Sequence, residues 1–381
     1  MSPSFLHRRQ WLQGLALGSL ASVAGVGVVR QCLASAAAGT ALVTAPQNSQ
    51  FNSASAAKAY GLEQIQIAVG GQGLLYYLPL VVAQQLQFFA AEGVQVQVQD
   101  YVGSQEALEA VRAGVAQIGS GAFVDVLMEQ ARGHYVKAFV LQGRMPQMAL
   151  GVSTRWMKGY QALPDLAGRR FGVSLLDAST IQATQLVLLR AGLPLDAVQY
   201  MEVGSGSEAI AALQSGRVHA LCQPDPLISV LEDRGDVQII CDLRNPKECE
   251  QLYGGVLPSG TLYASDVFLQ RNEAQAQAVT NAMLRALRWL QTASMLDLLK
   301  VVPPNYLLGS RRAYLAAFEK MRSTISPDGL MSADGPLVAQ RSLQRLYEAQ
   351  AQAPSTLGKN LDVERSYTNA LVKRGKQQLH L

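Results

Sequence analysis

The chain has 381 residues, of which 49% are hydrophobic and 16% charged, and its net charge at pH 7 is +4. This composition is typical of a globular protein with one or two cores, and it excludes an intrinsically disordered chain. The small positive charge gives no support for binding to nucleic acid.

The N-terminal segment predicts export from the cytoplasm. Arg8 and Arg9 precede a glycine-broken apolar run at residues 15–29, and a small-residue cluster follows at residues 34–38. This order predicts an export signal over residues 1–38, and the paired arginines followed by an aromatic residue resemble the twin-arginine type. The alternative is an uncleaved anchor helix, because the apolar run approaches bilayer-spanning length.

Residues 39–63 are rich in small and polar side chains, which indicates a flexible tether. With the signal removed, we expect a periplasmic protein. Three cysteines then remain, Cys222, Cys241 and Cys249. In an oxidising compartment two of them could pair, but three buried free thiols fit the sequence equally well.

From residue 64 onward, short strand patterns alternate with helical patterns, which predicts parallel sheets covered by helices. In the first half, the expected strands and helices are strand 65–69, helix 78–89, strand 94–99, helix 106–113, strand 117–118, helix 123–132 and strand 136–141. In the second half, they are strand 170–173, helix 181–191, strand 199–203, helix 207–215, strand 218–222, helix 227–233 and strand 237–241.

A weak internal repeat indicates two similar lobes. Residues 106–114 and residues 208–216 share the same pattern of an alanine-rich helix that ends in glycine, and each follows a strand and a glycine/serine turn. Because alanine-rich helices capped by glycine are frequent, chance similarity is the alternative interpretation.

The predicted fold is α/β, with two Rossmann-like lobes joined by a two-strand hinge. Strand-like stretches at residues 148–153 and 260–264 are expected to carry the chain between the lobes. Lobe 1 is expected to comprise residues 64–150 and 263–381, and lobe 2 residues 151–262. The C-terminal helices, expected at 273–292, 311–321 and 336–352, should pack on lobe 1.

The predicted ligand site lies at the turns that follow the strands. In open parallel sheets, ligands bind beyond the carboxyl ends of the strands, where helix N-termini present free N–H groups. Glycine and hydroxyl residues recur at these turns, which suits a carboxylate or sulfonate group. The candidate ligand-binding residues are Gln72, Tyr76, Tyr77, Ser104, Ser120, Phe123, Arg144, Ser179, Thr180, Ser205, Ser207 and Asp225.

Several of these candidates have a structural alternative. The serines that precede helices, Ser104, Ser179 and Ser207, are also ordinary helix N-caps. The three aromatic candidates are either walls of a cleft or core residues.

The two charged candidates also leave a choice. Arg144 is either an anion clamp or a solvated surface residue. Asp225, between two prolines, either accepts a hydrogen bond from a ligand amine or caps the helix that begins near Leu227.

Catalytic motifs are lacking. Of four histidines, His7 lies in the signal, His380 in the tail, and His134 and His219 stand singly. No pair has metal-ligand spacing, and the sequence contains no Cys-x-x-Cys, nucleophile elbow or phosphate loop. We therefore expect no catalytic residue, no metal, no cofactor and no enzymatic activity.

Six segments carry a resemblance to a known family: residues 65–69, 78–84 (LPLVVAQ), 88–94 (FFAAEGV), 108–119, 166–173 (LAGRRFGV) and 212–220 (ALQSGRVHA). Together they resemble the nitrate/sulfonate/taurine-type periplasmic substrate-binding proteins of ABC importers, over residues 64–290. His219 stands where the family pattern usually has Asp, so we expect a structural role for it.

The resemblance implies a type II periplasmic binding protein. Such a protein captures a small polar or anionic organic solute, sulfonate-, nitrate- or thiamine-precursor-like, between its lobes. It delivers the solute to an ABC permease in the inner membrane, and we expect it to be a monomer. The alternatives are an enzyme that resembles the thiamine-pyrimidine synthases, or a binding protein that reports to a membrane signalling partner.

Overall fold

The structure is a computed structural model that describes residues 63–176, 179–350 and 361–381. These residues all belong to one compact unit, residues 52–381. The predicted export signal and the tether, apart from residue 63, lie outside the described residues. In the described part of the chain, no helix combines the length and the apolar character that crossing a bilayer requires.

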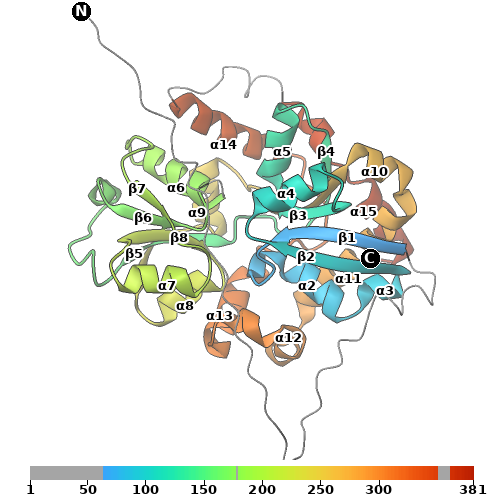
Figure 1. Ribbon diagram of the computed structural model, residues 1–381, viewed down its shortest axis with the longest axis horizontal. Coiled ribbons are helices and arrows are strands. Elements are labelled where there is room, and N and C mark those ends of the chain that lie inside the picture. Colours follow the sequence, from blue (N-terminus) through green and yellow to red (C-terminus); the bar gives the residue numbers. More distant parts are fainter. Residues whose placement is uncertain (1–62, 177–178, 351–360) are drawn as a thin grey trace, which may run out of the picture. The chain divides into compact units, whose positions relative to one another are not determined.

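The first sheet has five strands in the order β2-β1-β3-β10-β4 (Figure 1). Its strands are β1 Glu63–Gly70, β2 Val94–Tyr101, β3 Ile118–Ala122, β4 Val136–Leu141 and β10 Gly260–Ser265. β10 lies antiparallel between β3 and β4, while β1 pairs in parallel with β2 and β3. The sheet is therefore mixed rather than wholly parallel.

The second sheet repeats this arrangement in the order β7-β6-β8-β5-β9. Its strands are β5 Met148–Ser153, β6 Arg170–Val173, β7 Gln199–Glu202, β8 Ala220–Pro224 and β9 Val237–Asp242. β5 is the antiparallel member, between β8 and β9. Each sheet thus contains one strand that runs against the other four, and the sequence pattern did not indicate this strand's direction.

The sequence repeat occupies equivalent positions in the two sheets. Helix α4 (Ser104–Arg112) follows β2, and helix α7 (Ser207–Gln214) follows β7, and each of these strands lies at the outer edge of its sheet. Both helices end shortly before a glycine with positive φ, +73° at Gly114 and +76° at Gly216. Glycine adopts this left-handed conformation without steric penalty, which ends each helix at the same point.

The remaining helices cover these sheets or follow β10 in the chain. They are α2 Leu78–Gln85, α3 Phe88–Ala91, α5 Phe123–Ala131, α6 Ser179–Arg190, α8 Leu227–Asp233, α9 Pro246–Tyr253, α10 Asp266–Arg271, α11 Glu273–Thr292, α12 Met295–Val301, α13 Arg311–Arg322, α14 Gly335–Ala349 and α15 Ala370–Gln378. The single helix expected at 78–89 is two helices, because Gln87 adopts a left-handed conformation (φ +58°) between them.

The chain crosses between the sheets at residues 142–147 and 254–259, and the crossings are hydrogen-bonded to each other. The backbone N–H groups of Gln142 and Gly143 donate to the Gly260 carbonyl at 2.7 and 3.1 Å. The N–H of Ser259 donates to the Gly143 carbonyl at 2.9 Å. The two strands expected to form the hinge, β5 and β10, each begin immediately after a crossing and lie inside a sheet.

The C-terminal helices contact both halves of the molecule. α11 packs on α2, α3 and α15, as expected for helices that cover the first sheet. In addition, α13 lies against α8, and α14 contacts α6 and α9 as well as α5. The sequence did not indicate these contacts with the second sheet's helices.

The three cysteines in the described residues are free and buried. Burial raises the pKa of the Cys241 thiol to about 12 and that of Cys249 to about 11. Of the two alternatives left open by the sequence, the structure has the one with three free thiols.

Candidate ligand-binding cleft

A cleft that is open to solvent lies at the carboxyl ends of strands from both sheets. Its walls come from the turns after β1, β2, β6, β7 and β8. The lining residues are Gly70, Leu74, Tyr76, Tyr77, Val102, Gly103, Ser104, Ala122, Met148, Ser174, Leu175, Ser179, Thr180, Gly204, Ser205 and Pro224. No charged side chain is among them, so the polar character of the cleft comes from hydroxyl groups and backbone atoms.

Five hydroxyl-bearing residues line the cleft, in addition to the two tyrosines: Ser104, Ser174, Ser179, Thr180 and Ser205. The Thr180 hydroxyl lies 2.9 Å from the Ser174 hydroxyl and accepts a hydrogen bond from the Ser174 N–H at 3.2 Å. This pair links the residue after β6 to the first turn of α6, which lies at the cleft.

Tyr76 and Tyr77 form an aromatic wall with their rings edge to face, 4.9 Å apart between centroids. The Tyr76 hydroxyl accepts a hydrogen bond from Ser259 Oγ at 3.1 Å. Burial raises the pKa of the Tyr76 and Tyr77 phenols, so both stay neutral donors at physiological pH.

The N-termini of three helices, α4, α6 and α7, begin at or just behind this cleft. The N-cap residues of α4 and α7 are Gly103 and Gly206, and neither helix has a side-chain cap. The first N–H groups of these helices therefore lack intrahelical partners, and the positive ends of the helix dipoles favour a negatively charged ligand. The N-cap alternative fails for Ser104 and Ser207, because each is the first helical residue rather than the cap.

Half of the candidate residues meet at the cleft: Tyr76, Tyr77, Ser104, Ser179, Thr180 and Ser205. Ser174 and Leu175 also line it, although neither was predicted from the sequence. They come directly after β6, so the rule that located the other turns was sufficient to find them.

Four other candidates lie outside the lining. Ser120 and Phe123 are fully buried, and Ser120 Oγ accepts a hydrogen bond from Gln142 at 2.9 Å. The Gln72 side chain donates to Gln84 at 2.9 Å, and Ser207 is exposed. Ser120 lies inside β3 rather than in the turn after it, whereas Ala122, the last residue of that strand, does line the cleft.

The side chains of the two charged candidates are bonded to partners outside the cleft lining. Arg144 lies at the first crossing, where its Nε donates to the Ser323 carbonyl at 2.8 Å. Asp225 is fully buried, pairs with Arg244 at 3.3 Å and accepts the Ser229 N–H at 3.2 Å. Burial raises the pKa of the Asp225 carboxyl, and Arg244 opposes this shift. The capping alternative for Asp225 is thus the one that the geometry shows.

The histidines in the described residues do not reach the cleft lining. His219 Nδ1 accepts the Arg170 N–H at 3.1 Å and so joins the ends of β6 and β8. Burial and the nearby Arg170 lower the pKa of His219, which favours the neutral ring that this hydrogen bond requires. His134 lies 2.7 Å from Glu129. Within the described ranges, no cluster of three or more His, Cys, Asp and Glu side chains could hold a metal ion.

Comparison with known proteins places the chain in a family. Residues 75–293, more than half of the chain, match the family model described as NMT1/THI5 like. The chain belongs to this family. A search of curated proteins finds no match.

Solved structures share the fold. A protein from Bordetella bronchiseptica RB50 is 39% identical, with a TM-score of 0.78, and the match covers 84% of this chain and 98% of that one. The alkanesulfonate-binding protein SsuA from Xanthomonas axonopodis pv. citri, bound to MOPS, is 20% identical (TM-score 0.61; 81% and 98% covered). The periplasmic nitrate-binding protein NrtA from Synechocystis PCC 6803 is 12% identical (TM-score 0.60; 84% and 89% covered).

The predicted family resemblance is confirmed by the family match, and the predicted periplasmic binding protein fold is confirmed by these structures. The same fold also occurs in an enzyme, since the desulfurization enzyme DszB is 15% identical with a TM-score of 0.59 (83% and 99% covered).

Proposed function

We propose that this protein is the exported substrate-binding component of an ABC importer and that it captures a small organic anion in the cleft. The observation that carries this proposal is the convergence of hydroxyl groups and uncapped helix N-termini from both sheets on one cleft without charged side chains. Such donors bind an anion without a buried counter-charge.

Binding in this cleft couples to closure of the lobes. Ser104 and the tyrosines belong to turns of the first sheet, and Ser179, Thr180 and Ser205 to turns of the second. A ligand that contacts both groups stabilises the closed arrangement by its differential affinity for it. A permease that recognises only the closed form then receives loaded protein.

The cleft lining favours binding over catalysis. It offers hydroxyl groups and aromatic walls, and none of its described lining residues is a His, Cys, Lys or carboxylate side chain that could act as a general base toward a hydroxyl. SsuA and NrtA, which share the fold, are named as binding proteins, and this supports the same class of function for this chain.

The partners and location follow from the same proposal. The paired arginines Arg8 and Arg9 and the apolar run after them would direct folded protein through the twin-arginine route to the periplasm. There the protein would act as a monomer that docks on an inner-membrane ABC permease.

A ligand screen by thermal shift tests this function on the purified protein. The panel comprises taurine, longer alkanesulfonates, nitrate, benzoate and thiamine-pyrimidine precursors. A ligand at 100 times its Kd adds about 2.7 kcal/mol to the free energy of unfolding and should raise Tm by about 5 °C or more.

Calorimetry of the hits should then give one site per chain. Chromatographic detection of a converted panel compound would contradict a binding function, as would the absence of any shift across the organic anions.

A further inference from the structure

Three free thiols lie enclosed in one part of the core. Cys222 in β8, Cys241 in β9 and Cys249 in α9 are 0%, 6% and 0% exposed, and they belong to the same cluster of buried residues. A thiol reacts with an oxidant as its thiolate. Burial raises the pKa of the Cys241 thiol to about 12, so its thiolate is about a thousandfold scarcer than in an unfolded chain. The folded protein therefore shields these thiols from oxidation.

The strand order keeps two of the thiols apart. Leu150 of β5 is the register partner of Cys222 on one side and of Cys241 on the other. Because neighbouring strands are spaced about 4.8 Å apart, the Cα atoms of the two cysteines are separated by roughly 10 Å across β5. A disulfide requires a Cα separation below about 7 Å. The two cysteines therefore cannot be joined while β5 lies between β8 and β9.

The unfolded chain lacks this barrier. Only residues 223–240 separate Cys222 from Cys241, a loop short enough to close readily, whereas β5 comes much earlier in the chain. A thiol–disulfide oxidoreductase of the periplasm would accept two electrons and two protons from this pair of thiols, and its own reactive disulfide would become two thiols. The new S–S bond would hold the segments of β8 and β9 too close together for β5 to enter between them.

The number of cysteines adds a second hazard. Three of them remain when the predicted export signal is removed, so one disulfide within the chain leaves one thiol unpaired. An unpaired thiol in an unfolded chain can cross-link it to another chain. Oxidation before folding therefore blocks the second sheet and favours aggregation, whereas oxidation after folding finds no accessible thiol.

We propose that β5 inserts between β8 and β9 in the reducing cytoplasm, and that the protein is exported only after this step. The paired arginines Arg8 and Arg9 serve this order of events, because the twin-arginine route carries folded proteins. The inference rests on the export that is part of the proposed function, and it adds a physical reason for that route. An oxidising compartment traps the unfolded chain and leaves the folded one unchanged.

Adding an oxidant before or after refolding tests this inference on the purified protein. The chain is unfolded and reduced, freed of reductant, and then refolded by dilution. Diamide, an azo compound that takes two electrons and two protons from a pair of thiols, is added either to the unfolded chain or to the refolded protein. Early diamide should abolish most of the return of native tryptophan fluorescence, and dithiothreitol should restore it. Late diamide should leave all three thiols reduced by mass spectrometry.

Two cysteine variants provide a matched comparison. Cys249→Ala keeps the pair that flanks β5, and it should fail to refold after early diamide, with a disulfide between Cys222 and Cys241 found by peptide mass spectrometry. Cys222→Ala/Cys249→Ala cannot form a disulfide within the chain, and it should refold equally well with either order of addition. Recovery is read as the ratio between the two orders, so a variant of lower stability still gives a result.

Two outcomes of these refolding experiments would overturn the inference. One is equal recovery of the parent protein with early and late diamide. The other is full recovery of C249A although its disulfide has formed, because the bond would then be compatible with β5 in its place.

Exchanging residues 1–38 for a general secretory signal, which exports the chain unfolded, extends the test to the cell. The parent chain with this signal should yield little folded periplasmic protein, whereas C222A/C249A should yield as much as with the original signal. Equal yields of the parent chain from both signals, or equal loss of both chains with the secretory signal, would contradict the inference. All these yields are measured without ligand. A ligand screen without hits would count against the proposed binding function alone.

Discussion

At the scale of single residues, position relative to the cleft decides which serines have a role in binding. Ser179 and Ser207 both begin helices that follow a strand and a turn. Ser179 lines the cleft, whereas Ser207 is exposed and absent from the lining, which contains Ser205 instead. Two serines in the same local sequence pattern therefore have different surroundings in the folded protein.

Comparing Ser179→Ala with Ser207→Ala tests this difference. Loss of the Ser179 hydroxyl should weaken ligand binding by about 2- to 13-fold, because a hydrogen bond contributes about 0.5–1.5 kcal/mol net. Ser207→Ala serves as the control and should leave the affinity unchanged. Both variants should melt within about 2 °C of the parent protein, and equal affinities in calorimetry would argue against the assignment of Ser179.

At the scale of elements, a buried network holds the start of α8 in place. Arg244 is 3% exposed, and its guanidinium pairs with Asp242 at 2.7 Å and with Asp225 and Glu232 at 3.3 Å. Glu232 in turn pairs with Lys320 of α13 at 2.7 Å. Since the Asp225 carbonyl also accepts the Leu75 N–H at 3.0 Å, the network lies directly behind the contact between the β1 turn and the β8 turn.

Arg244→Met should lower the free energy of unfolding by about 3–5 kcal/mol, because it leaves the Asp225 carboxylate buried without its counter-charge. Urea denaturation measures this change. The double variant Asp225→Asn/Arg244→Met removes the unpaired charge and should recover most of the loss. A single variant as stable as the parent protein, or a double variant no better than the single one, would contradict the role given to this pair.

At the scale of the whole molecule, the two lobes should respond to ligand together. The crossings at residues 142–147 and 254–259 are short and mutually hydrogen-bonded, so we expect relative movement of the lobes to be a hinge about this region. The turns that line the cleft lie on both sides of this hinge, whereas the core helix α11 packs away from it on α2, α3 and α15.

Hydrogen exchange with and without saturating ligand examines this coupling. Backbone amides at residues 103–105 and 204–208 should both exchange more slowly with ligand, because one bound molecule shields helix N-termini from each lobe. The amides of α11 should be unaffected and serve as the internal control. Protection confined to one of the two turns would exclude closure around the ligand.

The order of most strands and helices and the internal repeat were predicted from the sequence by itself, whereas helices α9, α10 and α12 were not. Apolar residues alternate along strands because of burial, and glycine ends helices for steric reasons. Both effects act within about ten residues, so they leave a local pattern in the sequence. The rule that ligands bind at the turns after the strands predicted candidate residues there, and six of these candidates line the cleft.

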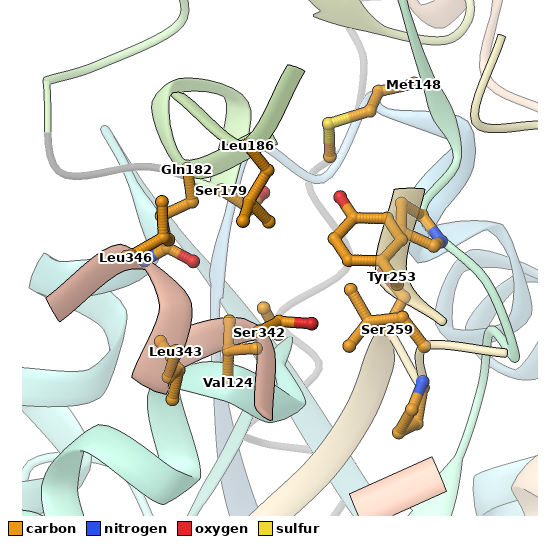
Figure 2. Close-up of a pocket in the computed structure, with 14 residues that line it drawn as sticks. Val124, Met148, Ser179, Gln182, Leu186, Tyr253, Ser259, Ser342, Leu343 and Leu346 are labelled. Atoms are coloured by element: carbon orange, nitrogen blue, oxygen red, sulfur yellow. The ribbon is translucent and has the colours of Figure 1, made fainter. Parts of the chain in front are cut away.

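The tertiary structure alone decided which turns share one cleft, and which polar groups were already occupied. Arg144 bonds to a carbonyl 179 positions away, and Asp225 pairs with Arg244 across 19 positions, so neither partner is visible in the local pattern. The same holds for a hollow beside the cleft, where α14, from near the end of the chain, packs beside α5 and α6 (Figure 2). Contacts between distant segments arise from packing of whole elements, and no local sequence rule encodes them.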